Sequence, residues 1–410
     1  MTTMTGLQCK ECGERYALDA SFVCEQCFGP LEVGYDFSSL DPESTKRKIQ
    51  AGTTGIWRYV DFLPFDSRPS SPLEPGFTPL IRATRLAEKL GIGEVWVKND
   101  AANPTHSFKD RVVAVALAKA RELGFETVAC ASTGNLANAV AAHAAAAGLE
   151  SYVFIPSDLE EQKILATGVY GTNLIGVRGN YDDVNRLCTE LAQSRPWAFV
   201  NVNLRPYYAE GSKTLAYETV EQLGWRMPDR IVGPIASGSL FTKIHRGFRE
   251  WTEVGLVEGQ LPAFHGAQAE GCSPVAGAYS EGHDICRPVK PSTIAKSLAI
   301  GNPADGPYAL DVARSTGGSI ESVTDDEIRH GIRLLAETTG IFTETAGGVT
   351  TATLAKLAEQ GTIGADDRVV VYITGEGLKT LDAIRGTFTT HEIDPTAEAF
   401  ESEVEQGVAA

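Results

Sequence analysis

The chain has 410 residues, of which 43% are hydrophobic and 22% are charged. Its 36 basic and 53 acidic residues give a net charge of −17, which argues against general nucleic-acid binding, because phosphate contacts need a basic surface. No stretch has the roughly 18 consecutive apolar residues that span a bilayer, and the N-terminus lacks the pattern of a secretory signal. We therefore expect a cytoplasmic globular protein of several domains, without nucleic-acid or membrane partners.

Half of the eight cysteines lie near the N-terminus, as Cys9, Cys12, Cys24 and Cys27. They form two C-x2-C pairs, and four thiolates suit tetrahedral Zn²⁺. Four sulfur ligands leave no open coordination position, so such a site is structural rather than catalytic. Unpaired thiols and redox-active pairs are the alternatives, although no βαβ pattern surrounds either pair. We expect a zinc ribbon over residues 1–40.

From about residue 80, short β-branched runs alternate with longer helical patterns. Strands are expected at 95–98, 127–131, 151–156, 173–177, 198–202, 230–233 and 368–373. Helices are expected at 111–123, 136–147, 159–169, 181–193 and 240–251. This alternation predicts an α/β fold with two parallel-sheet lobes. The expected larger lobe comprises 41–97 and 205–390, the smaller lobe 98–204, and a flexible tail 391–410.

Three loops fall at the expected carboxyl ends of strands, where open α/β sheets bind ligands. Residues 131–135 and 235–239 are strand-to-helix turns whose backbone N–H groups can hold an anion. The second turn lacks the GxGxxG and Walker patterns, so a monophosphate suits it better than a nucleotide. The third loop, 103–111, carries Lys109 at a helix start as a candidate nucleophilic amine.

Each loop alone also has a plain structural explanation, as an ordinary capped turn or a solvated surface lysine. Together they offer a phosphate site, a carboxylate site and a Schiff-base lysine. Pyridoxal phosphate needs this combination, because the protein must hold its phosphate, its ring and its imine.

Six motifs strengthen this interpretation: 104–111 (PTHSFKDR), 132–135 (STGN), 210–214 (EGSKT), 268–271 (QAEG), 300–303 (IGNP) and 374–379 (TGEGLK). In these segments the chain resembles the threonine synthases, which are fold-type II pyridoxal phosphate enzymes of the tryptophan synthase β-subunit superfamily. The resemblance covers residues 74–386, with the motifs in the family's order. It implies a lyase that converts O-phospho-L-homoserine and water to L-threonine and phosphate, and it implies a homodimer.

The resemblance also implies roles for individual residues. Lys109 would carry the cofactor and act as general base and acid, Asn135 would contact the cofactor's 3-hydroxyl, and Thr374 would face the pyridine nitrogen. Ser132 and Thr133 would hold the substrate carboxylate. The cofactor phosphate would lie against Ile235, Ala236, Ser237, Gly238 and Ser239.

Three positions depart from the family pattern. His106 stands where glycine is usual, Tyr208 stands where arginine is common, and residues 235–239 replace a glycine- and asparagine-rich phosphate loop. The candidates for binding the substrate phosphate are then His106, Arg111, Arg205 and Lys213. The departures leave open another replacement or elimination, as in cysteate synthase or threonine dehydratase. A zinc-ribbon interaction protein without catalysis is the alternative from a different class.

Overall fold

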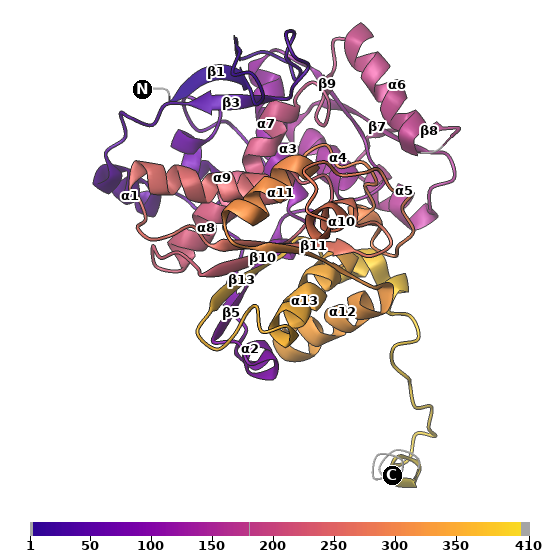
Figure 1. Ribbon diagram of the computed structural model, residues 1–410. Helices are drawn as coiled ribbons and strands as arrows, with labels where there is room; N and C mark the ends of the chain where they lie inside the picture. The colour runs from indigo at the N-terminus through magenta and orange to yellow at the C-terminus, as the bar shows by residue number, and fades with distance from the viewer. Residues whose placement is uncertain (1–2, 180, 403–410) are drawn as a thin grey trace.

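The computed structural model describes residues 3–179 and 181–402, which form three sheets surrounded by helices (Figure 1). The first sheet is antiparallel, has the order β2-β1-β3 and forms the N-terminal ribbon, residues 3–35. Its strands are β1 (Met4–Cys9), β2 (Arg15–Tyr16) and β3 (Leu31–Tyr35).

The largest sheet has six strands in the order β12-β11-β10-β13-β5-β4. All neighbours pair in parallel except β4, an edge strand that runs antiparallel to β5. Its strands are β4 (Leu80–Arg82), β5 (Glu94–Asn99), β10 (Arg230–Pro234), β11 (Ala263–Ala269), β12 (Ser319–Val323) and β13 (Arg368–Ile373). Residues 369–373 are apolar throughout because helices cover both faces of this sheet.

Alternate side chains of β13 enter two different cores, one on each face of the sheet. Val369 and Val371 pack with apolar residues of α2 (Thr84–Leu90), α12 (Asp325–Thr339) and α13 (Thr345–Glu359). Val370 and Tyr372 belong to the core formed by α8 (Thr214–Gln222), α9 (Ser239–Val254), α10 (Pro274–Ser280) and α11 (Gly306–Ser315).

The third sheet is parallel, with the order β8-β7-β6-β9. Its strands are β6 (Thr127–Ala131), β7 (Glu150–Pro156), β8 (Asn173–Val177) and β9 (Ala198–Phe199). The surrounding helices are α3 (Lys109–Glu122) and α4 (Asn135–Ala147) on one face, α6 (Tyr181–Ser194) on the other, and α5 (Glu161–Gly168) beside β8. Two expectations need correction. β9 ends early because the chain turns from residue 200, and β5 runs to Asn99, past the expected start of the smaller lobe at 98.

The N-terminal ribbon is fastened to two helices, α7 (Arg205–Glu210) and α9. Arg246 of α9 donates to the Glu32 carboxylate at 2.8 Å, and Lys243 pairs with the same carboxylate at 3.2 Å. The Tyr35 hydroxyl donates to Glu210 of α7 at 2.8 Å. The ribbon is therefore bound to the body through buried and half-buried polar contacts.

The remaining segments connect or end the sheets. Helix α1 (Pro42–Ala51) and the 3-10 turn Ile56–Phe62 lead into an irregular stretch before β4, and the 3-10 segment Gly377–Ile384 follows β13. Residues 391–398 are all exposed and lead away from the sheets to α14 (Ala397–Phe400) (Figure 1). Positions 403–410 of the expected tail lie outside the described residues.

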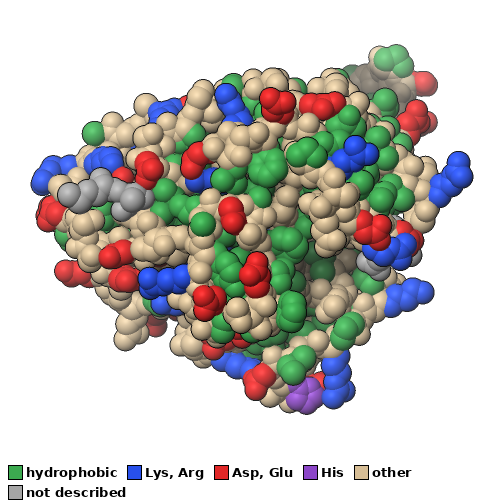
Figure 2. All heavy atoms as spheres, turned by 90° about the horizontal axis from the view of Figure 1, so that it is seen from above, with side chains coloured by type: hydrophobic (Ala, Val, Ile, Leu, Met, Phe, Trp, Pro, Cys, Tyr) green, Lys and Arg blue, Asp and Glu red, His purple; other side chains and the backbone are tan. Residues whose placement is uncertain are grey.

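The surface seen from above in Figure 2 carries acidic and basic side chains scattered among apolar ones, without a basic patch on that face. Among the described helices, none combines the length and the apolar character needed to cross a membrane.

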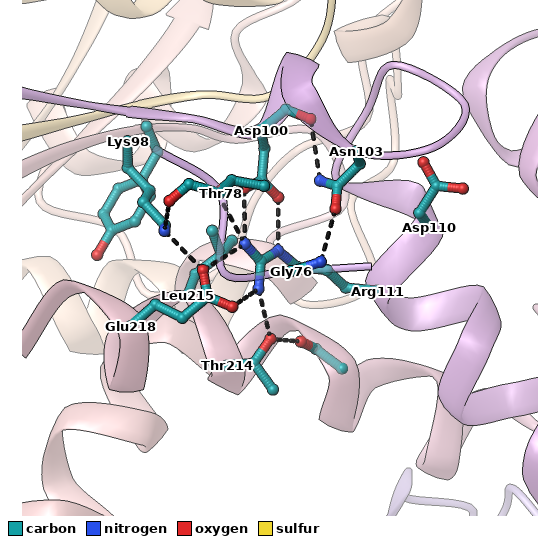
Figure 3. A network of polar contacts seen from close by, with 12 residues as sticks. Gly76, Thr78, Lys98, Asp100, Asn103, Asp110, Arg111, Thr214, Leu215 and Glu218 are labelled. Carbon is teal, nitrogen blue, oxygen red and sulfur yellow. Dashed lines mark hydrogen bonds and ion pairs between the residues drawn. The ribbon is translucent and has the colours of Figure 1, made fainter. Parts of the chain in front are cut away.

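A fully buried arginine links the two larger sheets. Arg111 of α3 donates to Asp100 at 2.6 and 2.8 Å and to Glu218 of α8 at 2.5 and 2.7 Å (Figure 3). Its guanidinium also donates to the hydroxyls of Thr78 and Thr214, each at 3.0 Å. All of its nitrogens are thus bonded inside the protein.

The electrostatics of this cluster keep its members charged despite burial. Burial pulls the pKa of Arg111 down, but the neighbouring carboxylates raise it above its usual range. Burial raises the pKa of Glu218, but Arg111 and then Lys98 outweigh this effect and lower it to about 2. A buried pair of this kind is costly to break, because the remaining charge is left without a partner.

We expect Glu218→Gln to lower the free energy of unfolding by roughly 3–5 kcal/mol at neutral pH. Because the pKa of Glu218 is lowered to about 2 from an ordinary 4.5, its stabilisation is complete above the ordinary value. It is lost as the pH falls towards 2, so the gap to wild type should narrow over that range. Urea unfolding across this pH range measures the gap. Glu337→Gln, in an exposed pair with Arg333, is the control and should cost under about 1 kcal/mol; equal losses for both variants would contradict the prediction.

Candidate active site

Four loops meet at the carboxyl ends of parallel strands, where ligand sites of open α/β sheets form. They follow β5, β10 and β13 of the largest sheet and β6 of the smaller one. The Phe108 N–H donates to the Thr374 carbonyl at 2.9 Å. Lys379 Nζ donates to the Thr105 carbonyl at 2.6 Å and to Asn135 Oδ1 at 2.7 Å. The loops after β5, β6 and β13 are therefore joined by direct hydrogen bonds, and the turn after β10 lies at the same edge of the largest sheet.

Lys109 is the first residue of α3 and is half-buried. Its Nζ donates to the Tyr208 hydroxyl at 2.6 Å and lies 4.7 Å from the centroid of the Phe108 ring. The sequence showed Tyr208 only as a replacement for an arginine, whereas the structure brings its phenol to the candidate nucleophile. A phenol both donates and accepts hydrogen bonds, so these two groups can exchange a proton.

Asn135 begins α4, and its side-chain amide lies between two charged groups. Nδ2 donates to both carboxylate oxygens of Glu344, at 2.9 and 3.1 Å, while Oδ1 accepts from Lys379. Burial raises the pKa of Glu344, and burial lowers the pKa of Lys379. The amide is thus bound at both ends before any ligand is considered.

Sequence reasoning missed Glu344 and gave Lys379 no role. Lys379 ends the 374–379 motif, so a signal was present. Glu344 gives no local signal, because it lies 209 residues from Asn135 along the chain. Only the packing of α13 against the largest sheet brings the two together.

The turn from β10 to α9 is built around a glycine. Gly238 has a φ of +95°, a conformation that favours glycine. A Cβ there would lie 2.6 Å from the Asp305 carbonyl oxygen. The Asp305 N–H in turn donates to the Ser237 carbonyl at 2.8 Å, which fixes the turn from the other side.

The residues of this turn divide into two groups. Ile235 is buried, and its N–H donates to the carbonyl of Ala267, so it serves the fold. Ala236, Ser237 and Ser239 are partly exposed. They lie where the first N–H groups of the 16-residue α9 lack intrahelical partners, which makes the turn suitable for an anion.

Ser132 and Thr133 form the short turn between β6 and α4, directly before Asn135. The Ser132 N–H donates to Phe154 at 3.2 Å, and its Oγ accepts from the Gly134 N–H at 3.4 Å. Thr133 is partly exposed. The pair therefore lies beside the positive end of α4.

His106 is exposed and has a φ of +62°. Residues with a Cβ adopt this left-handed conformation at a cost of roughly 1–2 kcal/mol, which explains the usual glycine. The conformation is held by the backbone, because the His106 N–H donates to the Asn103 carbonyl at 2.9 Å and its own carbonyl accepts from Glu376 at 3.1 Å.

The sequence makes Arg111 and Lys213 candidates for binding the substrate phosphate, but, contrary to this expectation, the structure buries both side chains in ion pairs with carboxylates of the protein. Both are fully buried, Arg111 in the cluster described above. Lys213 pairs with Glu210 at 2.7 Å and with Glu250 at 2.9 Å. Burial of a charge that is already neutralised cannot be seen in the sequence, and neither side chain is available to a substrate phosphate.

Arg205 has a different environment. It lies at the start of α7, its side chain is 34% exposed, and it pairs with Asp305 at 2.8 Å. The Asp305 N–H is hydrogen-bonded to the Ser237 carbonyl. Arg205 is therefore linked to the anion-binding turn through Asp305. Among Arg111, Arg205 and Lys213, it is the one whose side chain is partly exposed.

The four N-terminal cysteines lie together at the tip of the ribbon. Their sulfur atoms are all within 4.8 Å of one another. The Sγ atoms of Cys9 and Cys27 are 3.5 Å apart, and those of Cys12 and Cys24 are 3.6 Å apart. The expected cluster of four thiols is present.

Comparisons with known proteins agree with this geometry. The chain is 39% identical over 379 residues to the threonine synthase of Methanocaldococcus jannaschii, covering 92% of this chain and 93% of that protein. The threonine synthase of Methanosarcina acetivorans is also 39% identical, with 92% of each chain covered.

Solved structures share the fold at lower identity. Maize serine racemase matches with a TM-score of 0.62 at 20% identity, covering 73% of this chain and 88% of that one. Threonine deaminase isoform 2 from Solanum lycopersicum matches with a TM-score of 0.63 at 18% identity, covering 90% and 99%. A family model described as "Pyridoxal-phosphate dependent enzyme" matches residues 72–375, a span that holds the loops after β5, β6 and β10 and reaches the start of the loop after β13. The chain therefore belongs to the pyridoxal-phosphate dependent enzyme family.

Proposed function

We propose that this protein is a threonine synthase, which converts O-phospho-L-homoserine and water to L-threonine and phosphate. The observation that carries the proposal is the similarity to proteins of that name, at 39% identity over 92% of the chain. The loops of the site support it, because they offer an amine, an amide and two anion-binding turns.

The residues present fit pyridoxal phosphate. The N–H groups at the start of α9 and the hydroxyls of Ser237 and Ser239 suit its phosphate, and Lys109 supplies the amine that joins it. Asn135 has an amide for its 3-hydroxyl oxygen, and Thr374, 3% exposed, has a neutral hydroxyl for its ring nitrogen. When bound, the cofactor supplies an electron sink for bond breaking at the substrate Cα.

The chain's own groups perform the remaining tasks. Ser132 and Thr133 hold the substrate carboxylate beside the positive end of α4. The Lys109 amine takes the Cα proton and helps to move the β proton, as general base and acid. The proton stays on the Lys109 amine between these steps, and the hydroxyl of Tyr208, 2.6 Å away, accepts a hydrogen bond from that amine and so positions it. Phosphate leaves from Cγ with Arg205 as its cationic partner, and water adds at Cβ.

His106 and Tyr208 favour a second candidate. A side chain in place of glycine and a phenol in place of arginine suit a shorter substrate, in a cysteate synthase-like or threonine dehydratase-like reaction. The presence of both Lys109 and Asn135 argues against a zinc-ribbon interaction protein without catalysis.

We also propose that Cys9, Cys12, Cys24 and Cys27 bind one structural Zn²⁺. A tetrahedron with Zn–S bonds of about 2.3 Å has sulfur atoms about 3.8 Å apart. The distances of 3.5 and 3.6 Å support this ligand set. The cytoplasmic location and the homodimer stay predictions from the sequence.

We expect the purified protein with pyridoxal phosphate to act on O-phospho-L-homoserine with a higher kcat/KM than on O-phospho-L-serine, L-threonine or L-homoserine. Lys109→Ala should abolish turnover, because it removes the amine that joins the cofactor and moves the proton, and Lys379 is held by Thr105 and Asn135. Phosphate release and chromatography of the product measure both effects. If the wild type binds the cofactor but forms threonine from none of these substrates, the threonine synthase proposal is wrong and only the family assignment stands.

We expect Tyr208→Phe to lower kcat about 100-fold or more with little change in KM, because proton transfer by a positioned side chain contributes at that level. Steady-state kinetics with O-phospho-L-homoserine measure the split. Tyr170→Phe, at an exposed tyrosine, is the control. A raised KM with unchanged kcat would assign Tyr208 to substrate binding instead.

We expect about one equivalent of zinc per chain when the protein is prepared without added metal. Cys24→Ser should lose the metal and lower the melting temperature, because a structural site contributes folding energy. Elemental analysis and thermal unfolding measure this. Cys272→Ala, which changes a buried cysteine of the body, should keep the metal. A metal-free wild type would refute the zinc proposal.

A further inference from the structure

The side-chain amide of Asn135 has only one favourable orientation in its surroundings. The Glu344 carboxylate accepts hydrogen bonds and cannot donate them, whereas the Lys379 ammonium donates and cannot accept. In the observed orientation Nδ2 faces Glu344 at 2.9 and 3.1 Å, and Oδ1 faces Lys379 at 2.7 Å. A rotation of the amide by 180° would place oxygen against carboxylate and N–H against ammonium.

The two charged groups are themselves fixed. Lys379 also donates to the Thr105 carbonyl at 2.6 Å, in the loop that leads to Lys109. Glu344 is 4% exposed, and its N–H donates to the Gly375 carbonyl at 3.2 Å. A Cβ at Gly375 would lie 2.4 Å from a carboxylate oxygen of Glu344, so this glycine makes room for the carboxylate.

In the described part of the chain, the Glu344 carboxylate accepts side-chain hydrogen bonds from Asn135 alone, although the charges of Lys379 and Lys109 also act on it. It stands at the N-cap position of α13 but makes no side-chain capping bond. A buried carboxylate that neither caps its helix nor pairs directly with a cation is costly. The hydrogen bonds from Asn135 are therefore the direct contacts that offset the cost of burying the Glu344 carboxylate.

We propose that Glu344 and Lys379 are positioning residues that act through Asn135. They keep one N–H of Nδ2 available at a fixed place as a donor to the 3-hydroxyl oxygen of pyridoxal phosphate. The inference rests on the proposed function only in that it requires this cofactor. We call Glu344 and Lys379 the amide clamp. Without the amide clamp, the Asn135 amide can rotate and present its oxygen, which repels the 3-hydroxyl oxygen of the cofactor.

The test is a double-mutant cycle on cofactor affinity, measured by titrating cofactor-free protein with pyridoxal phosphate and following absorbance. Glu344→Met and Lys379→Met should each weaken binding about tenfold, the effect of losing one hydrogen bond. Glu344→Gln keeps an acceptor and should lose less than Glu344→Met. In an Asn135→Ala background, Glu344→Met should change affinity by less than about twofold, because its partner is already absent.

Glu321→Gln removes a carboxylate that pairs with Lys356 of α13, and it should leave the affinity unchanged. Equal tenfold losses from Glu344→Met with and without Asn135 would overturn the proposal, because the carboxylate would then act by another route. Unchanged affinity in Glu344→Met would also overturn it. If the wild type binds the cofactor but makes no threonine, the proposed function is wrong. The cofactor affinities of the variants still test the amide clamp in that case.

Discussion

The buried charge of Arg111 must be neutralised inside the protein, and the groups that neutralise it set the position of the candidate site. Asp100 follows β5, and Glu218 comes from α8 on the other side of the guanidinium. Lys109 lies only two residues before Arg111 at the start of the same helix. The hydrogen bonds that hold the Arg111 guanidinium therefore also fix the position of the Lys109 backbone, from which its amine extends. If Asp100 or Glu218 moved away, the buried guanidinium would be left without a partner and without water. This cost strongly favours the one arrangement of the two sheets in which both carboxylates contact Arg111.

The features that the sequence predicted are those with a local cause. Small residues at strand-to-helix turns, such as Gly238, and a lysine at a helix start show themselves in a short window, and so do two C-x2-C pairs. The α/β class followed in the same way from alternating patterns. What the sequence could not show depends on distant partners. The burial of Arg111 and Lys213 requires acids from other helices, and Glu344 meets Asn135 across 209 residues. The length of β9 was misjudged because an apolar run continues past the point where the chain turns.

Two of the three departures from the family pattern, His106 and Tyr208, have different physical meanings. His106 keeps the left-handed backbone that a glycine would adopt, with a φ of +62°, so the loop geometry is retained and only a side chain is added. Tyr208 replaces a fixed positive charge by a neutral hydroxyl that contacts Lys109 directly at 2.6 Å. The first change adds an exposed side chain to the loop that leads to Lys109. The second places a neutral hydroxyl, not a cation, beside the reactive amine, and Arg205 is linked to the anion-binding turn through Asp305.

The way in which the N-terminal ribbon is attached has a consequence for the order of folding. The ribbon closes over a short span, since 18 residues separate Cys9 from Cys27. Its bonds to the body span 175 residues between Tyr35 and Glu210 and 214 residues between Glu32 and Arg246. Closing long loops costs more entropy, and a growing chain supplies its N-terminus first. The ribbon can therefore fold early in synthesis but must wait for α7 and α9 before it docks. Helix α7 also carries Tyr208, the hydrogen-bond partner of Lys109. Tyr208 can therefore take its place beside Lys109 only after more than half of the chain has been made.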